Sequence, residues 1–320
     1  MRNLVTLATA ARLVGATTIA LALTTGCVPL EEQTSIQQAL PTADSVRIDV
    51  PAQYKALGDT AEFYRLTRQL SEDLNGGAGW VLVLVHTVVQ YPPTKVEGNV
   101  YTWGPHSDAL DPAEWRLTVI ENDDATYDWS LDARSKIAEG AEFLTIIDGN
   151  ATPGAEEHHG HGSFRIDFDA AESVDPDGND AQGKLAVEYN LGDKAGQPIA
   201  ISMHAEVADP SGTPGEIASF DYKYDEQPDG SGALQFGLHG DVDNNGSLED
   251  MRVHSRWQAN GAGRADVTGT SGSLGEIQIQ ASECWDTRFA RVYYTDSANW
   301  QAPEGTQEAC TFAEAAYPTL

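Results

Sequence analysis

Basic side chains are scarce in this sequence. Its 320 residues contain 19 Lys and Arg against 49 Asp and Glu, which gives a formal net charge of −30. A field of this sign repels the phosphates of nucleic acids and anionic lipid headgroups. The composition therefore argues against DNA or RNA as a partner and favours an acidic surface that resists aggregation.

Long apolar runs are scarce as well. Beyond the N-terminal region the longest is residues 80–91, with 12 residues, and it stops at Pro92 and Pro93. A membrane-spanning helix needs about 20 apolar residues. The sequence therefore predicts a soluble body without a spanning helix.

The motifs of common catalytic sites are missing. The sequence contains no P-loop, no dinucleotide-binding fingerprint and no H-E-x-x-H pattern. Residues 269–273 come close to a nucleophile elbow but lack its final Gly. Acidic residues are so numerous that no pair stands out as a glycosidase dyad. We therefore expect a non-catalytic protein rather than an enzyme.

The N-terminal segment has the parts of a cleaved export signal. Arg2 and Arg12 precede a short apolar run, residues 13–23. Small residues then follow up to Cys27. This end resembles the lipobox of bacterial lipoproteins, with Thr24 where that pattern usually has Leu. The resemblance implies a signal peptide of residues 1–26, a lipid on Cys27 and a membrane anchor. The alternative is an ordinary secreted protein.

Export would change the net charge of the chain and the expected state of its cysteines. Removal of residues 1–26 leaves 17 basic against 49 acidic residues, a formal charge of −32. Cys284 and Cys310 are then the only cysteines besides Cys27, and exported compartments oxidise such pairs to disulfides. By resemblance to sorted lipoproteins, Val28 fits release to the outer membrane.

The N-terminal part of the mature chain predicts a tether followed by two helices. Residues 27–58 are polar and contain several prolines, as in a tether. A helix over 59–75 has a capping-box start and ends at Asn-Gly-Gly. Residues 78–91 are rich in β-branched side chains, which favours a strand, but their length and continuous apolarity favour a buried helix. We predict a helix there, within one domain of residues 59–320.

From about residue 99 to 296 the apolar residues alternate with polar ones. Runs such as 115–119, 185–189 and 234–238 have this period of two and are separated by Asp/Asn-Gly turns. The pattern predicts a mainly β fold, an antiparallel meander of about a dozen strands. So many strands favour a barrel or half-barrel packed around the N-terminal helices. A two-sheet sandwich is the alternative.

A histidine cluster is the first candidate metal site. His158, His159 and His161 follow two glutamates, and imidazoles with a nearby carboxylate can bind Zn²⁺ or Cu²⁺. Such a site would suit a metal-dependent envelope enzyme. The flanking glycines equally suit a solvated loop that leads into a strand.

An acidic loop is the candidate calcium site. Asp241, Asp243, Asn245 and Glu249 stand at positions one, three, five and nine of an EF-hand-type loop, with Gly at position six. Position twelve is Arg252, where that loop has a bidentate acid, and the flanks have strand patterns. Calcium would make this a stabilised surface or adhesion module. The alternative is a hairpin loop without an ion.

Several segments together are similar to a group of uncharacterised bacterial lipoproteins. They are the strands at 115–119 and 160–170, the Trp-Gly-Pro at 103–105 and the Glu-Cys-Trp-Asp block at 283–286. A curved antiparallel sheet that holds a helix also resembles the lipoprotein carriers of the LolA and LolB type. This implies a binding or structural role at the cell envelope, with a lipid or other apolar ligand if the sheet encloses an open cavity.

Overall fold

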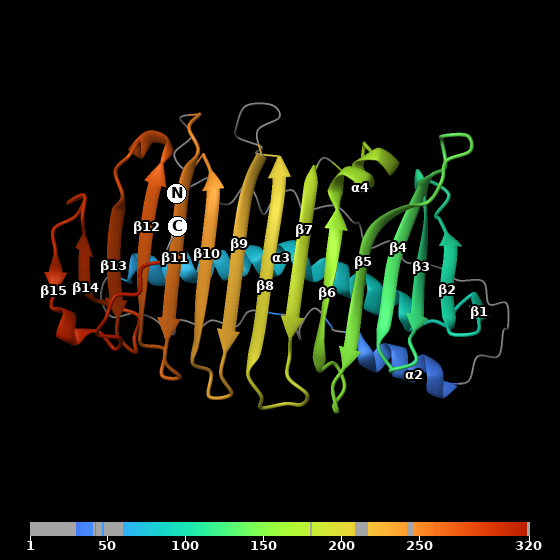
Figure 1. Cartoon of the computed structure of the whole chain (residues 1–320), viewed down its shortest axis with the longest axis horizontal. Helices are drawn as coiled ribbons and strands as arrows, with labels where there is room; N and C mark the ends of the chain where they lie inside the picture. Colours follow the sequence, from blue (N-terminus) through green and yellow to red (C-terminus); the bar gives the residue numbers. More distant parts are fainter. Residues whose placement is uncertain are drawn as a thin grey trace. The chain divides into compact units, whose positions relative to one another are not determined.

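The protein is built from one long series of antiparallel strands. The computed structural model describes residues 30–40, 42, 47, 60–179, 181–208, 217–241 and 246–318. Its 15 described strands follow one another in the order of the sequence, and within each of the two units described below each strand pairs antiparallel with its sequence neighbours (Figure 1). The predicted mainly β antiparallel meander is therefore confirmed. Cys27 and the predicted signal peptide lie outside the described residues.

The chain forms two compact units. We call them the β1–β7 unit, with the described residues of 30–47 and 77–195, and the β8–β15 unit, with the described residues of 60–76 and 196–318. Within each unit the strands pair with their sequence neighbours, and no described pairing closes the first strand onto the last. Each unit is thus an open sheet rather than a closed barrel. The prediction of a single domain stays a prediction.

Several strands of the β1–β7 unit alternate buried residues with more exposed ones, as their period of two predicts. In β3, for example, Leu117 and Val119 are buried and Thr118 between them is less so. A short helix, α4 (Phe168–Val174), follows β6, and the Asp167 carboxylate accepts a hydrogen bond from the Ala170 amide to start it. The strands are β1 (Lys95–Glu97), β2 (Val100–His106), β3 (Ala113–Glu121), β4 (Tyr127–Ser135), β5 (Leu144–Pro153), β6 (Gly160–Asp167) and β7 (Gly183–Asn190).

The β8–β15 unit is also an antiparallel meander, and it contains two 3₁₀ turns, η2 (Gly272–Leu274) and η3 (Gln307–Ala309). Its last strand has only two residues. The strands are β8 (Ile199–Ala208), β9 (Ile217–Glu226), β10 (Gly232–Gly240), β11 (Glu249–Trp257), β12 (Gly263–Ser271), β13 (Ile279–Trp285), β14 (Arg291–Asp296) and β15 (Glu304–Gly305).

Two hairpins of this unit repeat the same design. Gln227 and Gln258 each accept from a glycine three residues on, and a tryptophan of the following strand lies across a second glycine. The Trp285 ring lies so close over Gly263 that a Cβ there would come within 2.4 Å of it, and its Nε1 donates to the Gly261 carbonyl at 2.9 Å. Glycine therefore fixes where this indole sits, and the indole in turn supports the helix α3.

The helix α3 (Glu62–Val89) is continuous over 28 residues. The predicted break at Asn-Gly-Gly, between helices over 59–75 and 78–91, was wrong, whereas the helical interpretation of the second segment is confirmed to Val89. A glycine inside a helix costs only about 1 kcal/mol relative to alanine. Packing on both sides of the break outweighs that cost, because Leu70 and Ser71 are buried before it and Val85 and Val89 after it. Residues 62–76 belong to the β8–β15 unit and residues 77–89 to the β1–β7 unit.

Part of the predicted tether is a helix. Residues Leu30–Ala39 form α2, and Ile36, Ala39 and Leu40 are buried. These three positions are spaced i, i+3 and i+4, so they share one face of the helix. The Gln37 side chain donates to the Val89 carbonyl at 2.9 Å. The prediction of a polar tether over 27–58 was therefore wrong for residues 30–40, where a short apolar stripe was overlooked.

Candidate functional site

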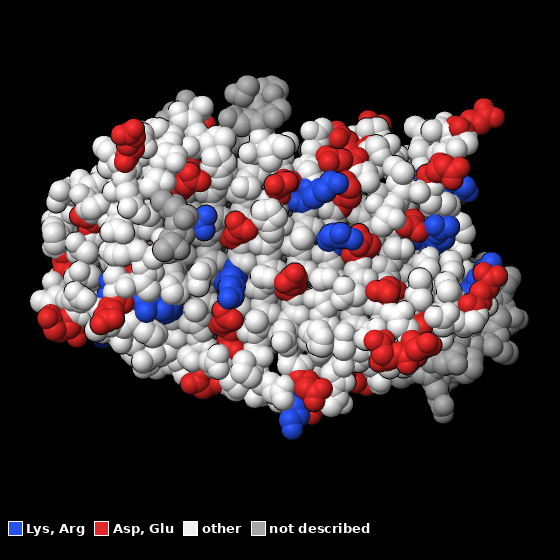
Figure 2. All heavy atoms as spheres, in the orientation of Figure 1, with Lys and Arg blue, Asp and Glu red and all other residues white. Residues whose placement is uncertain are grey.

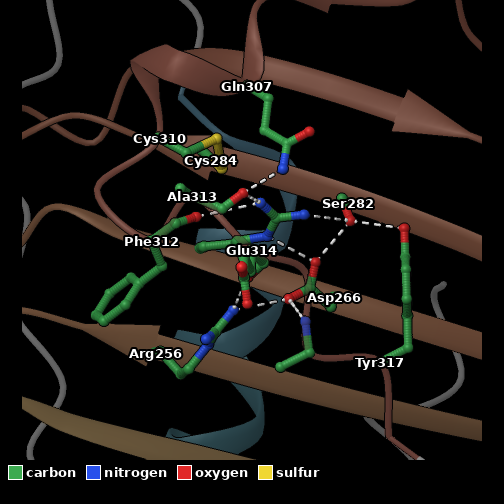
Figure 3. The surroundings of a disulfide bond; sticks show 12 residues. Arg256, Asp266, Ser282, Cys284, Gln307, Cys310, Phe312, Ala313, Glu314 and Tyr317 are labelled. Carbon is green, nitrogen blue, oxygen red and sulfur yellow. Dashed lines mark hydrogen bonds and ion pairs between the residues drawn. A yellow bond between two sulfur atoms is a disulfide. The ribbon is translucent and has the colours of Figure 1, made fainter.

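The predicted disulfide is present. Cys284 lies in β13 and Cys310 follows η3, and their sulfurs are bonded with the Cα atoms 5.5 Å apart (Figure 3). Both cysteines are buried. The bond holds the start of residues 311–318, which we call the C-terminal strap, against the sheet.

The strap covers one face of strands β11, β12 and β13. Successive strand residues point to opposite faces, so Ser255, Ala265 and Trp285 face α3, while the residues next to them face the strap. Arg256 and Asp266 stand on this strap-facing side (Figure 3). The charged side chain of Arg264 stands there as well, since it donates to two strap carbonyls. The face is thus polar, although it is covered by protein.

An arginine–aspartate pair lies at the centre of this face. Arg264 Nε donates to Asp266 Oδ1 at 2.8 Å, and the side chains are only 2% and 0% exposed. Ser282 donates to the same Oδ1 at 2.6 Å, and Arg256 donates to Oδ2 at 3.1 Å. Two guanidinium groups and a hydroxyl therefore satisfy one desolvated carboxylate, the arrangement that a buried charge requires.

Both arginines also bind the main chain of the strap. Arg264 Nη1 donates to the carbonyls of Phe312 and Ala313, both at 3.1 Å, and Arg256 Nη2 donates to the Glu314 carbonyl at 2.9 Å. In the opposite sense, the amide of Ala316 donates to Asp266 Oδ2 at 2.8 Å. Charged side chains of the sheet thus form hydrogen bonds with three consecutive carbonyls and one amide of the strap.

A histidine and two aromatic rings complete the contacts. His254 Nδ1 lies 3.1 Å from the Ala316 carbonyl, which can only accept, so Nδ1 must carry the hydrogen. Burial lowers the pKa of His254, which favours the neutral ring. At the two ends of the strap, the Phe312 ring lies under Arg256 and the Tyr317 hydroxyl lies 2.9 Å from Ser282 Oγ.

The opposite face of β13 receives the start of α3. Glu283 Oε1 accepts from the Phe63 amide at 2.6 Å, so this carboxylate caps the helix, and Arg291 approaches its other oxygen at 3.6 Å. Burial raises the pKa of Glu283 to about 6, against the opposing effect of these partners. A predicted cap at Asp59 lies outside the described residues.

A strained residue also holds this end of α3. Phe289 has φ +63°, a left-handed conformation that glycine adopts in the matching turns. Its ring stacks on Tyr64 at 4.3 Å between centroids, and its carbonyl accepts from the Ala61 amide at 3.0 Å. The packing of Phe289 on Tyr64 offsets the strain, which for a left-handed residue is about 1–2 kcal/mol.

The three histidines of the cluster make separate contacts in the structure. His158 Nδ1 lies 3.2 Å from the Leu40 carbonyl, His159 Nδ1 lies 2.9 Å from the Glu157 carbonyl, and His161 is an exposed residue of β6. In the part of the chain that the structure describes, no group of three His, Cys, Asp or Glu side chains is arranged to hold a metal ion. The hypothesis of a metal site at these histidines therefore finds no geometric support.

The acidic loop joins two strands, as its flanks predicted. Asp241 accepts from the Gly246 amide at 2.8 Å, which is a hairpin-loop contact. Glu249 begins β11 and its Oε1 accepts from the Ser273 amide at 2.8 Å, so it is engaged with η2. Asp243 and Asn245 lie outside the described residues, and calcium binding there stays a prediction.

The near-elbow at residues 269–273 lacks a catalytic alignment. Ser271 has φ +65° at the end of β12, as a strained nucleophile would. However, Ser271 Oγ donates to Asp250 Oδ2 at 2.7 Å, while His239 Nδ1 lies 3.0 Å from Oδ1 of the same carboxylate. The aspartate thus stands between the hydroxyl and the imidazole, so the imidazole does not accept the serine proton as it would in a triad.

The β1–β7 unit carries open ion pairs on its strands. Arg165 and Asp148 approach to 2.6 Å with 71% and 42% of their side chains exposed, and Arg134 and Glu114 approach to 2.6 Å. Phe143 lies beneath the guanidinium groups of Arg116 and Arg134. Figure 2 shows basic groups, in blue, beside acidic groups, in red, on this surface.

Comparison with known proteins adds no assignment. No family model, no curated protein and no solved structure matches the chain. Among the helices that the structure describes, none combines the length and the apolarity needed to cross a membrane.

Sequence reasoning missed the polar face beneath the strap. Arg264 and Asp266 are two residues apart in a strand, so their common face could have been predicted from the strand period. Nothing local indicated that they are buried, because the cover comes from residues 311–318. The two cysteines were the available signal, since one follows Ser282 and Glu283 in β13 and the other directly precedes the strap.

Proposed function

We propose that this chain is an exported, lipid-anchored protein of the bacterial cell envelope whose β-rich body has a non-catalytic binding or structural role. The lipobox-like residues before Cys27 support the anchor, and the alternation of strands and turns provides a body of ample size. Outer-membrane sorting is part of this proposal, on the basis of Val28.

The observation that carries the proposal is the disulfide between Cys284 and Cys310. Disulfides of this kind form and persist in exported compartments, whereas thiols in the cytosol are kept reduced. The disulfide is buried and closes a segment of 26 residues against the sheet, so it is part of the fold. The disulfide and the predicted export signal both support an exported location.

The side chains of the described polar face support a binding or structural role over a catalytic one. The charged groups of β11 and β12 are engaged with one another and with the strap's main chain, as described above. These charged groups hold the strap in position. They do so through hydrogen bonds, which is a structural role and not proton transfer.

Lipid attachment tests the anchor directly. The full chain is expressed in a bacterium fed with an alkyne-bearing fatty acid, and labelled protein is detected after coupling to a dye. We expect labelling and membrane recovery for the natural chain and for Cys310→Ser, and neither for Cys27→Ser. Unlabelled protein recovered from the soluble exported fraction in all three would instead establish an ordinary secreted protein and overturn the anchor.

A further inference from the structure

We propose that the strap-facing side of β11–β13 is a peptide-binding site, and that the chain's own C-terminal strap is its resident occupant. The ligand class is an extended peptide segment recognised through its main chain, with an aromatic side chain near each end. This goes beyond the proposed function, because it does not depend on whether Cys27 is lipidated.

The first argument is the direction of recognition. The strap contributes its carbonyls at 312, 313 and 314 and its amide at 316, and the sheet contributes guanidinium and carboxylate groups. The side chains of Ala313, Glu314 and Ala315 are exposed. A surface that forms hydrogen bonds with the main chain of a peptide and leaves its central side chains in solvent can bind peptides of many sequences, as peptide-binding domains do.

The second argument is energetic. An ion pair as buried as Arg264–Asp266 is desolvated at a penalty of several kcal/mol per ion, and well-packed apolar residues stabilise a fold equally well or better. Apolar residues would therefore suffice to hold a tail in place. Fixed charges from which Arg264 Nη1 and Arg256 Nη2 donate to strap carbonyls offer what apolar residues lack, which is orientation and selectivity for a polypeptide backbone.

The third argument is the way in which the occupant is attached. Residues 311–318 form neither helix nor strand, and they follow residues 301–309, which are all exposed. The disulfide at Cys310 keeps the strap next to the site, so its effective concentration there is high without requiring strong contacts of its own. A competing segment must displace a tethered occupant, which restricts the site to peptides that bind well.

The experiment releases the strap from a protein that has already folded. A recognition sequence for a site-specific protease is inserted after Thr306, within the exposed stretch, and the purified oxidised chain is cleaved there. A dithiol then reduces Cys284–Cys310, so that the fragment from Gln307 onward is held only by its non-covalent contacts and is removed by gel filtration. Circular dichroism checks that the sheet remains folded.

A fluorescent peptide of residues 311–318 is the probe. We expect it to bind the strap-free protein, and to bind the uncleaved oxidised protein at least tenfold more weakly because the site is filled. N-methylation of the Ala316 amide removes the hydrogen bond to Asp266 and is expected to weaken binding about tenfold or more. The Glu314→Gln peptide is expected to bind like the natural one, because that side chain faces solvent.

Variants of the protein locate the site. Arg256→Gln removes the donor to the Glu314 carbonyl and is expected to weaken the peptide severalfold, whereas Arg165→Ala in the β1–β7 unit leaves the affinity unchanged. Equal binding to cleaved and uncleaved protein, or equal binding of the N-methylated peptide, would overturn the proposal. So would loss of the folded sheet when the strap leaves, since the strap would then be a structural part and not a ligand.

Discussion

The two units place similar ion pairs in very different surroundings. In the β1–β7 unit Arg165 meets Asp148 at 2.6 Å in open solvent, and in the β8–β15 unit Arg264 meets Asp266 at 2.8 Å with almost no exposure. The distances alone would rank the two pairs as equals. Burial separates them, because water screens the first pair and competes for its hydrogen bonds, while the second depends wholly on its protein partners.

The largest difference is expected when one partner of each pair is removed. Arg264→Ala leaves the Asp266 carboxylate buried with fewer donors and is expected to lower the free energy of unfolding by about 3–5 kcal/mol. Arg165→Ala is expected to lower it by less than about 1 kcal/mol. Urea unfolding followed by tryptophan fluorescence measures both. Equal losses would show that the strap does not exclude water from the network.

Replacing both members of the buried pair sharpens the same comparison. Arg264→Met with Asp266→Leu removes both charges of the pair together, so the protein is expected to lose less stability than Arg264→Ala does, although Arg256 and the strap lose hydrogen-bond partners. A loss as large as that of Arg264→Ala would mean that the charges are needed for the fold itself, rather than for holding the strap in one register.

The disulfide is expected to have the next largest effect. Cys310→Ser frees the strap from β13 and, for a separation of 26 residues, is expected to lower the free energy of unfolding by about 3–4 kcal/mol in the loop-entropy description. The loss should fall on the β8–β15 unit, so hydrogen exchange should quicken around β11–β13 and stay unchanged in β3–β5. Uniform quickening in both units would contradict a local role.

The smallest expected effect is a pH dependence on the other face of β13. The pKa of Glu283 is raised to about 6 from the ordinary 4.5, so the folded state favours the protonated carboxyl. Its stabilising contribution is complete below pH 4.5 and is lost as the pH rises to 6, which amounts to about 2 kcal/mol. Glu283→Gln lacks this titration but retains an acceptor for the Phe63 amide.

Unfolding curves of both proteins at pH 4, 5, 6 and 7 provide the test. The stability of the natural protein relative to Glu283→Gln is expected to fall across that interval. Parallel profiles would show that the cap and Arg291 compensate fully for the burial of the carboxylate.

The alternation of apolar residues was sufficient to predict the strands, because each strand has one covered face and the period of two is a local property. The helix α3 was divided wrongly because glycine is a local signal, whereas the packing that carries the helix through Gly76 and Gly77 comes from distant strands. The stripe at Ile36, Ala39 and Leu40 was overlooked because three apolar residues among glutamines give little signal without the surface they cover.

Prediction of the candidate site was similarly limited. The disulfide could be predicted, since two cysteines remain once Cys27 is assigned to the lipid. Arg256, Arg264 and Asp266 have the sequence signature of solvent-facing strand residues, and only the strap turns them into a buried network. Conversely, His158, His159 and His161 are adjacent in the sequence, but the positive φ of His158 and the reversal of the chain there separate their ring contacts.

The docking of α3 has a consequence for the order of assembly. Phe63 is capped by a residue 220 positions later, and Thr67 meets a serine 188 positions later. Such contacts cannot form until almost the whole chain has been made, and pairings so distant in sequence form slowly. The apolar face of the first half of α3 therefore stays uncovered until β11 and β13 have been made and can pack against it. During that interval the chain is most exposed to proteases and to aggregation.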